Sequence, residues 1–189
     1  MLVVPSLLHY VIMKRFAWRL TGAIVLNPKA YEDVEADTSA TLQAMSVVVL
    51  SSVAAGVGLS GLRDDHLITI VTVSLLALAV WTVWALLTYE IGSWWLPSPG
   101  THVTVGELLR TIGFASAPGV FRIAGVIPGI RTAVFAVTAV WMLAGMVVAV
   151  RQALDFTSTA RAVAVCTLGW TLAIGLALGI GILFGLAVY

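Results

Sequence analysis

The stretch LITIVTVSLLALAVWTVWALLT, residues 67–88, decides the fold class of this chain. It has no ionisable side chain, and twelve of its residues are Leu, Ile or Val. A bilayer core about 30 Å thick needs about 20 apolar helical residues to cross it. At roughly −0.3 to −0.6 kcal/mol each, the aliphatic side chains favour insertion of the stretch by about 4–7 kcal/mol. The stretch therefore predicts a membrane-spanning helix.

The whole chain has the composition of a multi-span membrane protein. Of its 189 residues, 60% are hydrophobic and 10% are charged, and the mean hydropathy is +1.05. An average soluble domain is about 45–50% apolar and about 25% charged. The composition therefore excludes soluble enzymes, disordered tails and fibrous repeats. The net charge of +1 gives no reason to expect nucleic-acid binding.

Four further spans are predicted on either side of residues 67–88. They cover about 41–62, 105–127, 133–150 and 162–188. We therefore expect an all-α integral membrane protein with a bundle of about five transmembrane helices over residues 39–189. Residues 1–38 form a separate N-terminal segment, whose apolar start is too short to span and is expected to lie on the membrane surface.

The third predicted span, 105–127, is the least regular. Thr104 and Glu107 have the spacing of a capping box, which predicts that the helix begins at Val105. Pro118 lies inside the span and removes a backbone donor, so we expect the helix to be kinked or broken there. If the chain turns back at Pro118, the count becomes four spans and a re-entrant hairpin.

Positive charges near the span ends predict the orientation, because cytoplasmic flanks are rich in Lys and Arg. The N-terminal side has six such residues and the opposite side has two: Lys14, Arg15, Arg19, Lys29, Arg151 and Arg161 against Arg63 and Arg131. We predict a cytoplasmic N-terminus and a C-terminus outside. Two lysines against eight arginines indicate a GC-rich genome, and hence a bacterial cytoplasmic membrane.

The densest charge lies before the first span, in Glu32, Asp33, Glu35 and Asp37. The alternating carboxylates imitate the start of a calcium loop, but the glycine and the final glutamate of such a loop are missing, which excludes an EF-hand. A looser cation site, a solvated helix that begins at Pro28 behind the cap Asn27, and a docking surface for a basic partner remain as alternatives. We expect no metal and no cofactor.

A second polar group follows the second span. Glu90 ends that span and could pair with Arg110 in the third. Arg110 and Arg122 could also each reach the headgroups, because each lies within about two turns of an end of its span. The sharper interpretation is a polar cavity beside the break at Pro118, which a small transporter or channel would use. No acidic residue lies at the centre of any predicted span, and no internal repeat is visible, so a coupled transporter is not the leading hypothesis.

Ser60 lies in the sequence Gly58-Leu59-Ser60-Gly61, which resembles the serine motif of rhomboid intramembrane proteases. The physical setting disfavours a nucleophile. Ser60 is expected at the C-terminal end of a span, where free carbonyls and not oxyanion-binding N–H groups point outward. His66 lies in the following turn, and His102 is predicted on the opposite side of the membrane. An intramembrane serine hydrolase stays as a remote alternative.

Small residues at a spacing of four predict close helix packing, either within one bundle or between copies of the chain. The pairs are Gly175 with Gly179 and Gly181 with Gly185 in 162–188, and Gly113 with Ala117 in 105–127.

Several of these residues resemble the Ypt-interacting protein (Yip) domain family over most of the chain, from about Leu20 onward. The segment 31–37, YEDVEAD, followed by Gln43-Ala44, is similar to prokaryotic members. The segment 113–118, GFASAP, resembles the family's Gly-Tyr-Ala-x-x-Pro pattern with Phe114 in place of the tyrosine. The five-span layout with a cytoplasmic N-terminus is the third similarity.

The resemblance implies an all-helical five-span bundle. Eukaryotic members of the family bind prenylated Rab-type GTPases and act in vesicle traffic and membrane shaping. Their cytoplasmic Asp-Leu-Tyr-Gly-Pro motif is absent here, and only Asn27-Pro28 and Tyr31 occupy a comparable place. A bacterial source would offer no Rab partner, so the resemblance implies the fold and not GTPase binding.

The leading hypothesis is a non-enzymatic membrane protein that organises the bilayer, recruits protein partners or self-associates through its small-residue faces. The candidate partner or ligand residues are Tyr31, Glu32, Glu35, Asp37, Glu90, Arg110, Pro118 and Arg122.

Overall fold

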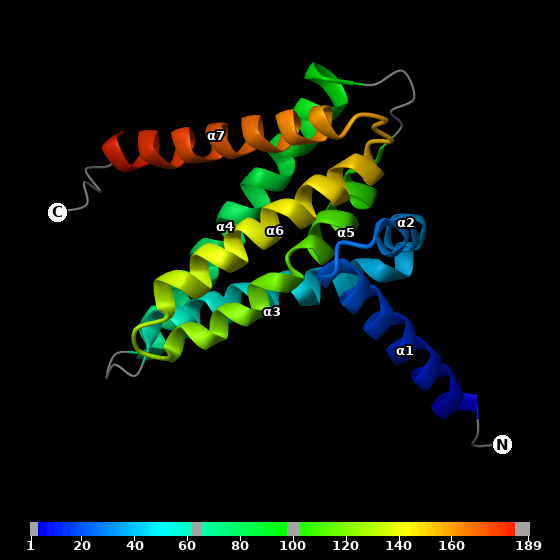
Figure 1. Ribbon diagram of the computed structural model, residues 1–189, viewed down its shortest axis with the longest axis horizontal. Helices are drawn as coiled ribbons and strands as arrows, with labels where there is room; N and C mark the ends of the chain where they lie inside the picture. Colours follow the sequence, from blue (N-terminus) through cyan, green and yellow to red (C-terminus); the bar gives the residue numbers. More distant parts are fainter. Residues whose placement is uncertain (1–3, 62–65, 98–102, 184–189) are drawn as a thin grey trace.

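The computed structural model describes residues 4–61, 66–97 and 103–183, and within these ranges all regular structure is helical (Figure 1). The elements in chain order are α1 (Val4–Ile24), α2 (Pro28–Ala36), η1 (Thr38–Ala40), α3 (Thr41–Ser60), α4 (His66–Glu90), η2 (Ile91–Trp95), α5 (Val105–Ala115), η3 (Ala117–Val126), α6 (Arg131–Ala153) and α7 (Thr159–Leu183).

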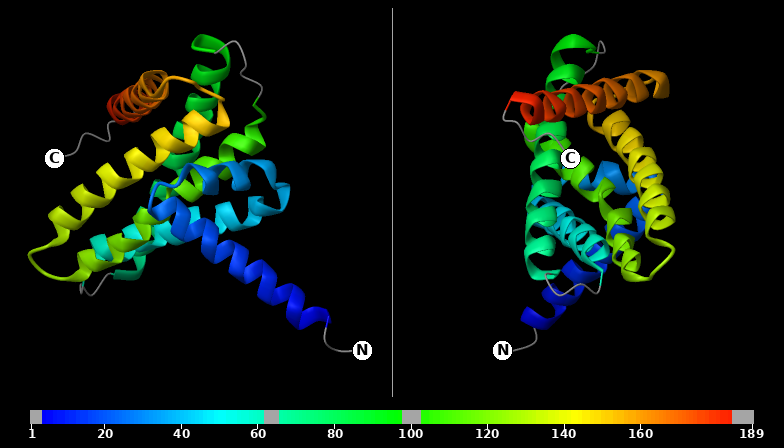
Figure 2. Two further views of the ribbon diagram at one scale, coloured as in Figure 1. Left: turned by 45° about the vertical axis from the view of Figure 1, so that its right-hand side comes forward. Right: turned by 90° about the vertical axis from the view of Figure 1, so that its left-hand side faces the viewer.

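A bundle of α3, α4, α6 and the continuous pair α5–η3 forms the body of the protein (Figure 1). We call one end of this bundle the α2 end, because α2, η2, the start of α5 and the connection from α6 to α7 all lie there. Two helices leave the bundle: α1 projects to one side, and α7 crosses over α4 and α6 (Figure 2).

Three helical stretches of the described residues are long and apolar enough to cross a membrane. They are Thr38–Ser60, Leu67–Trp95 and Arg131–Ala153, with mean hydropathies of 1.8, 2.3 and 2.4. They coincide with the first, second and fourth predicted spans. The all-α class is confirmed over the described residues, and the protein has the helices of a membrane-associated chain; the third and fifth spans stay predictions.

Local sequence sets the helix starts as expected. The Asn27 side chain accepts a hydrogen bond from the Lys29 backbone N–H at 3.1 Å, and Pro28 opens α2. At α5 the capping box is complete: the Glu107 carboxylate accepts from the Thr104 N–H at 2.7 Å, and the Thr104 hydroxyl oxygen accepts from the Glu107 N–H at 3.2 Å. Both bonds satisfy donors that a helix leaves unpaired at its start.

The predicted span 105–127 is not one α-helix. The α-helix α5 ends at Ala115, and the chain continues from Ala117 as the 3₁₀ helix η3, with Pro118 in its first turn. Pro118 has no N–H to donate and its ring crowds the preceding turn, so the α-helical ladder stops before it. The break lies where the sequence placed it.

Small residues let the broken segment approach its neighbours. A Cβ at Gly58 of α3 would overlap the Arg122 carbonyl oxygen of η3, and a Cβ at Gly113 would stand 3.0 Å from the Ala44 Cβ. Ala117 is buried at the start of η3. The Gly113–Ala117 pair therefore serves packing within one chain.

Gly175 and Gly179 of α7 face open space, whereas Gly169 of the same helix packs against Trp84 and Thr88 of α4. Nothing lies within 4 Å of a Cβ built at Gly175 or Gly179. Gly185 and the surroundings of Gly181 lie outside the description.

Candidate functional site

The polar side chains of the N-terminal segment meet where α1 turns into α2. The α1 helix ends with the Asn27 N–H donating to the Gly22 carbonyl at 2.8 Å, and Leu26 adopts a φ of 60° in this turn. The returning α2 lies against α1, because Gly22 leaves room for Ala30. Tyr31 is fully buried at this junction, and its hydroxyl donates to the Ala23 carbonyl at 3.2 Å.

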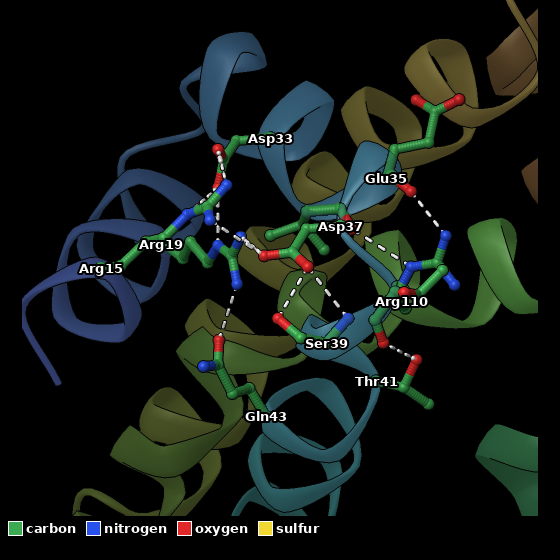
Figure 3. A network of polar contacts seen from close by, with 11 residues as sticks. Arg15, Arg19, Asp33, Glu35, Asp37, Ser39, Thr41, Gln43 and Arg110 are labelled. Atoms are coloured by element: carbon green, nitrogen blue, oxygen red, sulfur yellow. Dashed lines mark hydrogen bonds and ion pairs between the residues drawn. The ribbon is translucent and has the colours of Figure 1, made fainter. Parts of the chain in front are cut away.

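Arg19 is the centre of the junction, and its side chain is completely buried. Figure 3 shows its guanidinium between two carboxylates: Nε donates to Asp33 Oδ2 at 2.6 Å, and a terminal nitrogen donates to Asp37 Oδ2 at 2.5 Å. The other terminal nitrogen donates to Gln43 Oε1 at 3.0 Å. A buried charge is tolerated when it is paired and hydrogen-bonded, as the Arg19 guanidinium is by these three side chains. Arg19 thereby connects α1, α2 and the start of α3.

Arg15 covers the same carboxylates from outside, one helical turn earlier. Its side chain is 50% exposed and contacts Asp33 at 2.7 Å and Asp37 at 3.2 Å. The other Asp37 oxygen accepts from the Ser39 N–H and hydroxyl at 2.9 and 2.6 Å. Hydrogen bonds from Arg15 lower the pKa of Asp33, and those from Ser39 and then Arg19 lower the pKa of Asp37. We call Arg15, Arg19, Asp33 and Asp37 the arginine clamp.

Arg110 of α5 holds the other end of α2. It is 6% exposed, and its guanidinium donates to the Val34 carbonyl at 3.2 Å and to the Glu35 carbonyl at 2.5 Å. A helix leaves its last carbonyls unpaired, and a cation there also complements the helix dipole. The expectation that Arg110 reaches headgroups or pairs with Glu90 was wrong: Glu90 is exposed at the end of α4, and the α2 carbonyls occupy Arg110.

The Glu35 carboxylate points away from Arg110, toward the side of α6 (Figure 3). Partial burial and the negative charges of Asp155 and Glu107 raise the pKa of Glu35 to about 7, with Glu32 adding to the effect and Arg110 opposing it. Glu32 is exposed and accepts a hydrogen bond from the Gln152 side chain of α6 at 2.7 Å. The acidic residues 32–37 therefore contribute to the contact between α2 and the bundle.

The residues predicted to line a polar cavity do not come together. Arg122 contacts the Thr138 hydroxyl at 3.3 Å and lies 5.5 Å from the centre of the Phe135 ring, near the far end of the bundle. Pro118 is buried, Arg110 caps α2, and Glu90 is exposed. A hollow of about 320 Å³ lies at the turn between η3 and α6, and none of these four residues lines it. Its lining consists of Ile127, Pro128, Gly129, Arg131 and Thr132.

Ser60 has the environment of a structural hydroxyl. It is 1% exposed and donates to the Val57 carbonyl one turn earlier in α3, at 2.9 Å. His102 lies outside the described residues. Within the described ranges, no group of three or more His, Cys, Asp or Glu side chains could hold a metal ion.

Sequence reasoning missed the arginine clamp as a unit, although it noted each charge. Arg15 and Arg19 are four residues apart, and so are Asp33 and Asp37. A spacing of four places each pair on one face of a helix. A basic pair before the Asn27-Pro28 turn and an acidic pair after it could therefore have predicted that the two segments face each other. Gln43 and Ser39 complete the cluster and had no comparable signal.

Comparison with protein-family models, with curated proteins and with solved structures finds no match to this chain. The resemblance to the Yip domain family, drawn from the sequence, therefore stays a prediction.

Proposed function

We propose that this chain is a multi-pass, non-enzymatic membrane protein of Yip-like type, which organises the bilayer or recruits and assembles protein partners in it. In this proposal five spans cross the membrane, counting α5–η3 and α7, and the N-terminus is cytoplasmic.

One observation carries the proposal: charged side chains build a platform of α1 and α2 at one end of an apolar bundle. The charged groups connect helices to one another and are not arranged as a reactive centre. They are the fully buried Arg19, the carboxylates of Asp33 and Asp37, and the buried Arg110, which binds the last carbonyls of α2. Such a platform presents a fixed surface to other molecules at the membrane face.

The surface of α1 supports a position on the bilayer. Large apolar side chains are exposed along it: Tyr10, Val11, Ile12, Met13 and Trp18 are 46–63% exposed. An exposed apolar helix next to basic residues is typical of a segment that lies in the headgroup layer.

The arrangement of basic residues supports the proposed orientation. The α1–α2 junction, the end of α6 and the start of α7 share the α2 end of the bundle (Figure 1). Arg161 of α7 donates to the Pro97 carbonyl at 2.9 Å, which fixes the start of α7 near η2. The α2 end would then face the cytoplasm, where Lys and Arg accumulate.

The test is recovery of partners or of oligomers from membranes in mild detergent. Arg19→Met should release α1 from α2 and reduce the recovery severalfold. Arg131→Met, an exposed arginine at the opposite end of the bundle, is the matched control and should leave recovery unchanged. Wild-type protein that always emerges as a lone monomer would contradict the proposal.

The transporter alternative depends on the break at Pro118, because irregular backbone at membrane depth is tolerated only where it is buried in protein or lines a water-filled cavity. In this structure Pro118 is buried, which is the first of these two cases. Flux measurements in liposomes compare wild-type protein with Glu90→Gln and Arg122→Ala. A flux that these substitutions alter would support the transporter and displace the proposal above.

A further inference from the structure

The hollow at the turn between η3 and α6 lies at the end of the bundle opposite the α2 end (Figure 1). Its volume of about 320 Å³ is in the range of pockets that take small ligands. Two polar side chains line it, the Arg131 guanidinium and the Thr132 hydroxyl, beside Ile127, Pro128 and Gly129. Nothing lies within 4 Å of a Cβ built at Gly129, so the space beside the turn is open. The hollow therefore has both the room and the polar groups for a ligand.

The Arg131 guanidinium is held in position at this hollow. Its Nε donates to the Gly125 carbonyl of η3 at 3.3 Å. A Cβ built at Gly61, directly after α3, would stand 2.8 Å from a terminal nitrogen of Arg131, so the guanidinium lies against the end of α3. Within the described residues the terminal nitrogens have no hydrogen bond or ion pair. The cation is thus oriented before a ligand arrives, which lowers the entropic cost of binding one.

The described helices provide no carboxylate to neutralise the positive charge at this end of the bundle. There is no Asp or Glu in α3, η3 or α6, and those of α4 and α5 are Glu90 and Glu107 at the α2 end. Arg122 of η3 adds a second cation. It contacts Thr138, seven residues after Arg131 in α6 and about 10 Å farther along the helix axis. The charge at this end therefore favours an anionic ligand.

The surroundings of the hollow are those of a membrane interface. The helix α6 begins at Arg131, and its 23 residues rise about 35 Å, slightly more than the hydrocarbon thickness of about 30 Å. When α6 crosses a bilayer, its first residues lie at the level of the headgroups. The apolar Ile123, Ile127 and Ile130 beside the hollow are 53%, 50% and 41% exposed. A ligand here meets a cation on one side and an apolar surface on the other, which suits a phospholipid.

We propose that this hollow binds an anionic phospholipid, with the Arg131 guanidinium and the Thr132 hydroxyl donating to its phosphate and its acyl chains along Ile123 and Ile127. A guanidinium presents paired N–H groups that match two phosphate oxygens. Arg122 lies deeper and adds to the positive potential without a bond to the phosphate.

The inference rests on the proposed crossing of the membrane by α6, but it does not depend on recruitment of partners. Arg131→Met should lose the lipid and keep partner recovery, for which it is the control above. Failure of the lipid site and failure of partner recruitment are therefore seen in separate measurements.

The experiment is native mass spectrometry of protein from a maltoside detergent, titrated with phosphatidylglycerol or with phosphatidylcholine of the same acyl chains. Wild-type protein should retain phosphatidylglycerol about fivefold better, the factor expected for one arginine at a membrane surface. Equal retention of the two lipids would overturn the proposal. Glycerophosphoglycerol, the same headgroup without acyl chains, should not displace the lipid at equal concentration. Displacement would show that the hollow takes a free phosphate compound and would overturn the lipid as its occupant.

Variants locate the preference for phosphatidylglycerol. Arg131→Met removes the cation and should abolish most of the preference, and Thr132→Val should reduce it. Gly61→Ala keeps the charge but displaces the guanidinium, so it should also reduce the preference. The control Lys29→Met removes one exposed positive charge at the α2 end and should keep it. Equal losses from Lys29→Met and Arg131→Met would show attraction to net charge alone and would overturn the site.

A thermal melt in the same detergent separates lost binding from lost folding. Phosphatidylglycerol should raise the melting temperature of wild-type protein more than that of Arg131→Met, because only the wild type binds the lipid at this hollow. Phosphatidylcholine should raise the two melting temperatures equally. An equal rise for both proteins with phosphatidylglycerol would contradict the proposal, whatever their stabilities without lipid.

Discussion

Replacing Arg19 by methionine tests whether the arginine clamp holds the platform to the bundle. Methionine keeps much of the apolar stem but removes the guanidinium and its bonds to Asp33, Asp37 and Gln43. Removing one partner of a buried ion pair costs about 3–5 kcal/mol, because the other charge is left without compensation. The two carboxylates keep 28% and 18% exposure and retain Arg15. We therefore expect the low end of the range, about 3 kcal/mol.

Arg15→Met is the matched control, since Arg15 contacts the same two carboxylates from a side chain that is 50% exposed. Exposed ion pairs contribute about 0–1 kcal/mol, so this variant should lose far less stability than Arg19→Met. Both are measured by titrating the protein from mild detergent into SDS and following helix content by circular dichroism. Adding Asp33→Asn to Arg19→Met should recover part of the loss, because it removes a carboxylate that has lost a partner.

Equal losses for Arg15→Met and Arg19→Met would refute the argument from burial. They would mean that Arg19 is hydrated in solution and that α1 and α2 part easily. A loss from Arg19→Met of less than about 1 kcal/mol, the range of exposed pairs, would lead to the same conclusion.

Three further predictions concern other parts of the structure. The pKa of Glu35 is raised from 4.5 to about 7, so the folded state holds more protons than the unfolded state between pH 4.5 and about 7. The free energy of unfolding should therefore fall as pH rises through this range. In the SDS titration, Glu35→Gln should remove this pH dependence, and Asp155→Asn should shift it to lower pH. Arg110→Met leaves the last carbonyls of α2 buried without a hydrogen-bond donor and should lower the free energy of unfolding by about 2–3 kcal/mol. The loss should appear as faster proteolysis within α2. An unchanged cleavage rate would show that water replaces the guanidinium. Gly58→Ala places a methyl group against a backbone carbonyl of η3 and should destabilise the bundle by about 1–3 kcal/mol, measured by a thermal melt in mild detergent. Gly175→Ala is the control: nothing lies within 4 Å of its new methyl group, so its melting temperature should be unchanged or slightly raised.

Much of the fold follows from short-range signals in the sequence. The caps at Asn27 and Thr104 act on the next few residues of the chain, so a local pattern suffices to predict them. The break at Pro118 has the same origin, because a missing N–H affects only the turn before it. The long apolar stretches predict helices because a helix satisfies its backbone hydrogen bonds within one segment, as lipid requires.

The candidate site depends on contacts that no local pattern contains. Arg110 meets the Val34 carbonyl across 76 residues of chain, and its acceptors are backbone oxygens, which every residue has. Proximity in the expected layout suggested Glu90 instead. Burial of Arg19 follows from the way α1, α2 and α3 pack around it, and a charged residue in a largely apolar segment gives no sign of this in advance. The carboxylates that partner it were visible, but not their geometry.

The length of α4 together with η2 has a mechanical consequence. The stretch Leu67–Trp95 has 29 residues and rises about 44 Å, whereas the hydrocarbon layer measures about 30 Å. In a bilayer the rod must lean or carry its tip into the headgroups, and the lean must grow where the membrane is thin. Because α7 crosses over α4, a greater tilt of α4 would change the angle at which the two helices meet.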